Sequence, residues 1–120
     1  MRVLVIGGGA REHVICDAVS KSKNTQLFSV MKNLNPGIKI LSEEYLLGKE
    51  TNIERVVDFA DKNKIDLAII GPEAPLEVGL ANELIKNDID TCSPSKEAAR
   101  IETNKEWMRK ILKKYKIPGQ

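Results

Sequence analysis

Short apolar segments alternate along the chain with longer segments in which apolar residues recur every three or four positions. The short segments have the length of buried strands, and the spacing of the longer ones is that of one helix face. The predicted strands are residues 2–6, 26–31, 66–70 and a shorter one at 90–92, and the predicted helices are residues 11–23, 52–63 and 76–87. This alternation is typical of βαβ units. We therefore predict an α/β fold, an open and mainly parallel sheet of about four strands with helices on both faces.

The apolar positions of each predicted helix are expected to face the sheet. They are Val14, Ile15, Ala18 and Val19 in the first helix, Ile53, Val56, Val57 and Ala60 in the second, and Leu80, Ala81, Leu84 and Ile85 in the third. Residues 32–50 are less regular, and there we predict a turn at 35–37 and a short strand at 38–41. Farther on, we predict a short helix from Ser95 to residue 101 and a final helix over residues 103–116.

Composition narrows the class of protein. The chain has 120 residues, of which 42% are hydrophobic and 30% are charged, as expected for one globular core. Lysine and arginine number 19 against 17 acidic residues, so charge predicts no nucleic-acid partner. No apolar segment approaches the roughly 20 residues of a membrane span, and no signal peptide is visible, so we expect a cytoplasmic protein without a membrane partner. Cys16 and Cys92 lack partners at metal-ligand spacing, so we predict reduced thiols and no metal site.

The first candidate site is Gly7-Gly8-Gly9, directly after the strand at residues 2–6. Glycine reaches positive φ at low cost and lets an anion approach backbone N–H groups at the positive end of the next helix. Arg11, Glu12 and His13 follow on the first turn of that helix. The forked guanidinium group of Arg11 could bind a phosphate, but a solvated position on the helix surface is equally consistent with the sequence. His13 has no partner that would make it a general base, so we name no catalytic residue.

The second candidate site is the loop Gly71-Pro72-Glu73-Ala74-Pro75, which follows the predicted strand at 66–70. Its prolines fix φ and so hold the Glu73 carboxylate on a stiff loop. Ligands of open parallel sheets bind outside the carboxyl ends of the strands, so we expect the two loops to be neighbours. One loop offers N–H groups for phosphate and the other offers an acceptor for hydroxyl groups. Together they predict a site for a sugar phosphate.

The first loop only partly fits the dinucleotide fingerprint. That fingerprint requires glycine at its first, third and sixth positions and an acidic residue about 20 residues later. Gly7 and Gly9 fit, but Glu12 stands at the sixth position, and residues 31–33 are Met, Lys and Asn. Lys32 could face a 2′-phosphate, so an NAD(P)-binding oxidoreductase domain stays an alternative.

Three separated segments carry a more specific resemblance. They are Val-Ile-Gly-Gly-Gly-Ala-Arg-Glu-His at 5–13, Ile-Gly-Pro-Glu-Ala-Pro-Leu at 70–76, and Ser-Pro-Ser-Lys-Glu-Ala-Ala-Arg-Ile-Glu-Thr-Asn-Lys at 93–105. In this order, over nearly the whole chain, the sequence resembles the glycinamide ribonucleotide synthetase family, the phosphoribosylamine–glycine ligases of the ATP-grasp superfamily. The resemblance implies a Rossmann-like pre-ATP-grasp domain over residues 1–102. Residues 103–120 would then be the opening helix of the ATP-grasp region.

The resemblance also implies particular site residues. Those expected to bind the phosphoribosyl substrate are Gly7, Gly9, Arg11, Glu12, His13, Gly71, Pro72 and Glu73. Lys105 matches a family lysine that reaches toward the phosphates of ATP. The activity implied is ATP-dependent joining of glycine to 5-phosphoribosylamine in purine synthesis, through a glycyl phosphate, with Mg²⁺ or Mn²⁺ as the metal.

Length separates two interpretations of this activity. Members of the family run to several hundred residues, so we expect this chain to be an amino-terminal part, with ATP and metal bound mainly outside it by the rest of the same polypeptide. The isolated chain is then predicted to be inactive. The alternative is a free-standing, non-catalytic module that binds a sugar phosphate or nucleotide. An open reading frame that continues past Gln120 would favour the ligase.

Overall fold

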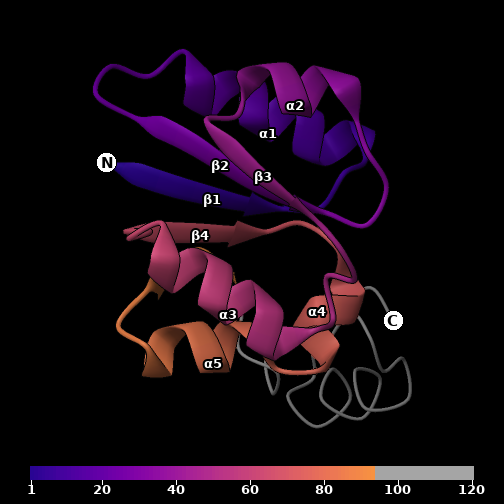
Figure 1. The fold of residues 1–120 in the computed structure, drawn as a ribbon, viewed down its shortest axis with the longest axis vertical. Coiled ribbons are helices and arrows are strands. Elements are labelled where there is room, and N and C mark those ends of the chain that lie inside the picture. Colours follow the sequence, from indigo (N-terminus) through magenta and orange to yellow (C-terminus); the bar gives the residue numbers. More distant parts are fainter. Residues whose placement is uncertain (94–120) are drawn as a thin grey trace, which may run out of the picture.

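The computed structural model describes residues 1–93. Its core is a five-stranded parallel sheet in the order β3-β2-β1-β4-β5 (Figure 1). The strands are β1 (Arg2–Ile6), β2 (Gln26–Met31), β3 (Glu44–Leu47), β4 (Leu67–Ile70) and β5 (Asp90–Thr91). The helices are α1 (Ala10–Ser20), α2 (Pro36–Leu41), α3 (Ile53–Lys62), α4 (Glu73–Glu77) and α5 (Leu80–Lys86). The predicted α/β class is confirmed, with one strand more than the expected number of about four.

Helices cover both faces of the sheet, and the alternation of side chains along β1 divides the core between them. Leu4 and Ile6 pack in one apolar cluster with residues of α3 and α5, whereas Val3 and Val5 pack in a second cluster with Cys16 of α1 and Ile38 of α2. Figure 1 shows α1 and α2 on one side of the sheet and α3, α4 and α5 on the other. A central strand buried on both faces is therefore almost wholly apolar.

The predicted inner face of the second helix is confirmed, because all four of its apolar residues pack against the core. In the other two helices the prediction is partly wrong: Val14 is 71% exposed, Ile85 is 54% exposed, and Ala18 also faces solvent. In α1 the buried side chains are Glu12 and Cys16, one helical turn apart. Ile15 and Val19 pack against the core as predicted, but a buried carboxylate is invisible to a hydrophobic pattern, so the predicted face includes Val14 and Ala18 in place of Glu12 and Cys16.

The predicted strand at 38–41 is wrong, because Pro36–Leu41 form α2. Asn35 is its N-cap and accepts hydrogen bonds from the N–H groups of Gly37 and Ile38, while proline occupies the first turn. The strand of this region is instead β3, which lies at the edge of the sheet and pairs with β2. None of its residues is fully buried, which explains its weak apolar signal.

The predicted helix at 76–87 is two helices. Gly79 adopts φ +91° between them, a conformation that interrupts a right-handed helix and suits glycine. Glu73 begins α4 rather than standing in an extended loop. Both helices predicted after residue 94 lie outside the described residues, as does the expected division after residue 102. Within residues 1–93, no helix is long and apolar enough to cross a membrane.

Candidate functional site

The predicted glycine loops meet at the carboxyl edge of the sheet. The first two crossovers lead from β1 to β2 and on to β3, and the third crosses to β4 on the other side of β1. Ile6 at the end of β1 is paired with Ile70 at the end of β4, so Gly7 and Gly71 follow adjacent strands. Such a reversal of strand order opens a ligand crevice in α/β sheets.

Glu12 occupies the space between these two glycines. A Cβ on Gly7 would lie 2.5 Å from Glu12 Cγ, and a Cβ on Gly71 would lie 2.6 Å from the same atom. Gly7 also has φ +124°, which disfavours other residues. Glu12 is 5% exposed, and its Oε1 accepts a hydrogen bond of 3.0 Å from the N–H of Gly9. The close approach that these glycines allow is therefore that of a protein carboxylate.

Arg11 fastens the two loops to each other. Its Nη2 donates a hydrogen bond to the carbonyl oxygen of Gly71, and its Nε lies 3.2 Å from Glu12 Oε2. The Arg11 side chain is 67% exposed, so this ion pair adds little stability by itself. Its effect is to neutralise the buried carboxylate and to hold the end of β4 beside α1. A ligand phosphate at this place would compete with these bonds for the guanidinium.

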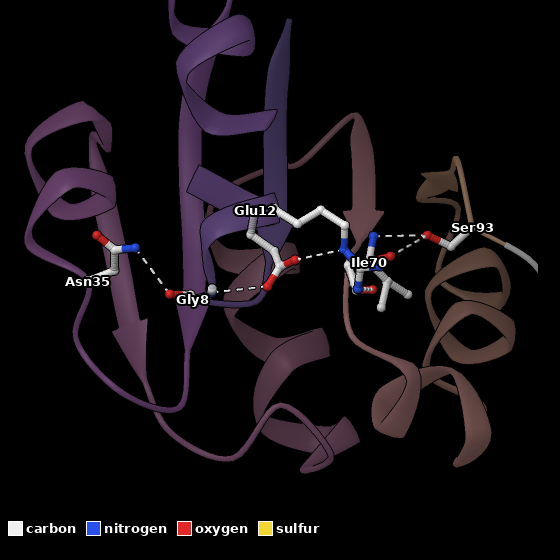
Figure 2. Close-up of polar contacts among 8 residues, drawn as sticks. Gly8, Glu12, Asn35, Ile70 and Ser93 are labelled. Atoms are coloured by element: carbon white, nitrogen blue, oxygen red, sulfur yellow. Dashed lines mark hydrogen bonds and ion pairs between the residues drawn. The ribbon is translucent and has the colours of Figure 1, made fainter. Parts of the chain in front are cut away.

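Two further side chains fix the edges of the site (Figure 2). On one side, Asn35 Nδ2 donates to the carbonyl oxygen of Gly8 at 3.1 Å while its Oδ1 caps α2. On the other, Ser93 Oγ accepts from the N–H of Ile70 at 2.9 Å. The backbone of both loops is thereby held by neighbouring elements rather than by the loops themselves.

A cavity of about 260 Å³ opens beside the first loop, with Gly8, Gly9, Glu12, Lys32, Asn33, Glu50 and Pro72 as its lining. A second cavity of about 310 Å³ adjoins it and shares Lys32, Glu50 and Pro72. We call the two together the crevice. Both charge signs line it: the carboxylates are those of Glu12 in α1 and Glu50 in the β3–α3 loop, and the ammonium groups are those of Lys32, just after β2, and Lys49, in the β3–α3 loop. This lining suits a small, polar, anionic ligand that also carries hydroxyl groups.

Glu50 is the titratable group that the crevice perturbs most clearly. Burial raises the pKa of the Glu50 carboxyl above its usual range, and the negative charge of Glu12 adds to this rise. The Lys32 ammonium and a hydrogen bond from the Lys32 backbone N–H oppose it. The charge of Glu12 thus acts on the Glu50 carboxyl group in the crevice.

The other predicted site residues do not all lie in the crevice. The His13 ring lies against Gly37 of α2, where an added Cβ would almost coincide with ring atoms, so this side chain packs two helices together. His13 also borders a separate, open cavity of about 370 Å³ with Val14 and Asp17. Pro72 lines the crevice, whereas the exposed Glu73 lines neither of its cavities. Lys105 lies outside the described residues.

The part of the chain that the structure describes offers no group of three or more His, Cys, Asp or Glu side chains suited to hold a metal ion. Glu12 and Glu50 do not make such a cage, because Glu12 is already bonded to Gly9 and Arg11.

Comparison with known proteins identifies the family. Residues 1–102 match the family model described as phosphoribosylglycinamide synthetase, N domain. The chain belongs to this family. A phosphoribosylamine–glycine ligase of Methanocaldococcus jannaschii is 53% identical over 119 residues, which are 99% of this chain and 27% of that protein. The chain thus spans about a quarter of the length of this curated relative, and the resemblance inferred from the sequence is confirmed.

Solved structures agree on the fold of this phosphoribosylglycinamide synthetase N domain. The phosphoribosylglycinamide synthetase of Anaerococcus prevotii superposes with a TM-score of 0.74 at 21% identity, covering 96% of this chain and 29% of that one. The N5-carboxyaminoimidazole synthetase of Staphylococcus aureus, solved in complex with ADP, superposes with a TM-score of 0.75 at 12% identity over 94% of this chain and 29% of that one.

Sequence reasoning missed or misjudged two residues that line the crevice of this N domain, Glu50 and Lys32, and a third, Asn35, that supports its first glycine loop. Glu50 sits in the irregular segment between predicted elements, and Asn35 was assigned to a turn. Lys32 was weighed solely as a partner for a 2′-phosphate. For Asn35 a signal existed, because Asn-Pro-Gly is a good helix start. For Glu50 none did, because only the position of β3 in the sheet brings its loop beside the first glycine loop.

Proposed function

We propose that this chain is the amino-terminal part of a phosphoribosylamine–glycine ligase of purine biosynthesis, acting in the cytoplasm. The observation that carries this proposal is the match of nearly the whole chain, at 53% identity, to a protein of that name. The crevice at the reversal of strand order supports it, because its lining suits a small sugar phosphate. No nucleic acid or membrane is part of the proposal.

In this proposal the described domain holds the phosphoribosyl group. The amino-terminal end of α1 and Lys32 attract the phosphate, and Glu12 holds the backbone of the first glycine loop beside them. The proposed substrate-binding residues remain Gly7, Gly9, Arg11, Glu12, His13, Gly71, Pro72 and Glu73. Of these, Gly9, Glu12 and Pro72 line the crevice directly, and Arg11 and Gly71 act by holding Glu12 in place.

The reaction joins glycine to 5-phosphoribosylamine. The glycine carboxylate takes the terminal phosphoryl group of ATP and releases ADP, and the amine then attacks the carbonyl carbon of glycyl phosphate and displaces phosphate. Residues 1–93 would bind and orient the amine-bearing sugar for this attack, which is a gain in proximity rather than a chemical step.

ATP, glycine and the metal would be held mainly by the rest of the same polypeptide. We propose a domain boundary after residue 102, which the extent of the family match supports, and residues 103–120 as the opening helix of the ATP-grasp region, with Lys105 directed toward ATP.

An assay of glycine-dependent release of ADP and phosphate tests this proposal. A longer polypeptide that carries this chain should form glycinamide ribonucleotide from 5-phosphoribosylamine, whereas the 120-residue chain alone should turn over nothing and bind ATP poorly. Clear turnover by the 120-residue chain would contradict the proposed division of labour. Failure of the longer polypeptide to use 5-phosphoribosylamine would contradict the function itself.

A further inference from the structure

Glu50 stands in the crevice with one carboxylate oxygen left unpaired. It belongs to the loop between β3 and α3, and it lines both cavities of the crevice. The Lys32 N–H donates a hydrogen bond to its carboxylate, which anchors this loop to the end of β2. Its Oε2 is buried, and within the described residues it has no hydrogen-bond partner.

An unpaired buried acceptor is costly. Leaving such a group without a hydrogen-bond partner costs free energy, because its interaction with water is lost and nothing replaces it, and the cost is larger for a charged group. Among the buried side-chain atoms of residues 1–93, Glu50 Oε2 is the one that stands without a partner. Uncompensated polar atoms of this kind need an explanation, and a ligand that supplies the missing donor is one.

The surroundings of Glu50 define the donor that fits. Glu12 lies across the first cavity and contributes a second negative charge, while Lys32 contributes the positive charge of the same cavity. A ligand that carries an anionic group at one end and hydroxyl groups at the other would pair with the Lys32 ammonium group and would donate a hydrogen bond to the Glu50 carboxylate. In dinucleotide folds the acid that binds ribose hydroxyls follows the second strand, whereas residues 31–33 of this chain offer none.

We propose that Glu50 is a specificity-determining residue that accepts hydrogen bonds from the ribose hydroxyl groups of the ligand, replacing the missing acid after β2 with one supplied after β3. This inference rests on the proposed function, since it assigns the sugar end of the same phosphoribosyl site. Lys32, which lines the same two cavities, then faces the phosphate. Glu50 thereby distinguishes a phosphorylated sugar from phosphate alone.

Calorimetric titration of the 120-residue chain with ribose 5-phosphate and with inorganic phosphate tests this assignment. The unmodified chain should bind ribose 5-phosphate more tightly than phosphate. Glu50→Gln keeps the shape of the side chain but removes its charge, and it should weaken ribose 5-phosphate binding about tenfold, the loss of one charge-assisted hydrogen bond. Its affinity for inorganic phosphate should not fall.

Glu54→Gln is the matched control, because Glu54 is an exposed carboxylate in the first turn of α3 that lines neither cavity. It should change neither affinity. Thermal unfolding adds a readout that a merely structural role would move in the opposite direction. Glu50→Gln should melt at the same temperature as the unmodified chain or higher, because it removes a desolvated charge.

The outcomes separate the two proposals. If the unmodified chain prefers ribose 5-phosphate and Glu50→Gln keeps that preference, the role of Glu50 is overturned while the proposed function stands. If Glu50→Gln melts at a lower temperature and loses affinity for ribose 5-phosphate and for inorganic phosphate alike, the proposed role of Glu50 is also overturned, since the residue would then be structural. If the unmodified chain does not bind ribose 5-phosphate at all, both proposals fail.

Discussion

Glu12 is the residue on which the geometry of the crevice depends. Its side chain fills the space that glycine leaves at the ends of β1 and β4, and its carboxylate joins the N–H of Gly9 to the guanidinium of Arg11. A buried carboxylate is tolerated here because it is hydrogen-bonded and paired with a positive charge. Three glycines (Gly7, Gly9 and Gly71), one acid and one arginine thus form a single unit drawn from both loops.

Gly71→Ala tests this unit. The new methyl group would lie 2.6 Å from Glu12 Cγ, so Glu12 must move and lose its bond to Gly9. We expect a loss of about 1–3 kcal/mol in the free energy of unfolding, as for other overpacked sites. Urea denaturation measures it.

The double variant Gly71→Ala with Glu12→Ala is the control, because shortening Glu12 frees the space that the methyl group needs. In that background Gly71→Ala should cost much less, which is a coupling between the two positions. Equal costs in both backgrounds would show that the glycine is required for another reason.

Cys16 provides a prediction with a defined pH window. Burial raises the pKa of its thiol from 9.0 to about 11, with a smaller contribution from Glu12 and an opposing hydrogen bond from Ser29. Above pH 9 the thiol ionises in the unfolded chain but stays neutral in the folded one, so ionisation favours unfolding. Stability should therefore be unaffected below pH 9 and should fall between pH 9 and 11, by about 2–3 kcal/mol from this group.

Cys16→Ala removes this titration and leaves the exposed Cys92 in place. The difference in unfolding free energy between the variant and the unmodified chain should stay constant up to pH 9 and then shift in favour of the variant. A difference that is constant up to pH 11 would mean that the thiol titrates alike in both states.

At the scale of elements, α2 shows how local chemistry outweighs a short apolar pattern. The segment Ile-Lys-Ile-Leu alternates like a strand, but Asn35 and Pro36 before it start a helix. The same Asn35 side chain reaches the Gly8 carbonyl, so the start of α2 also supports the first glycine loop. One side chain thereby couples a helix end to the crevice.

Asn35→Ala should lower stability by about 1–2 kcal/mol through loss of the cap, and it should also release the Gly8 carbonyl. Asn52→Ala is the matched control, because Asn52 caps α3 through the N–H of Arg55. Both variants should lose stability, but in NMR spectra the Asn35 variant should shift the Gly8 and Gly9 amide signals more than the Asn52 variant does. Equal shifts of these signals in the two variants would contradict the role of Asn35 in holding the Gly8 carbonyl group.

At the scale of the whole molecule, strand and helix alternation was enough to predict an α/β sheet and the meeting of two glycine loops at its carboxyl edge. The pattern succeeded for β1, β2 and β4 because these strands are mostly buried and mainly apolar. It failed for β3, whose residues are half-buried or exposed at the sheet edge. The place of Glu50 depends on that strand, so this part of the crevice could not be predicted from local sequence.

We propose that the crevice at the carboxyl ends of β1 and β4 holds a phosphoribosyl group. A ¹⁵N NMR titration of the 120-residue chain with ribose 5-phosphate tests this. We expect weak, saturable binding, with amide shifts concentrated at residues 8–13, 32–33 and 50. Shifts concentrated at the opposite edge of the sheet, around Asn24 and Asn63, or no shifts at all, would contradict it.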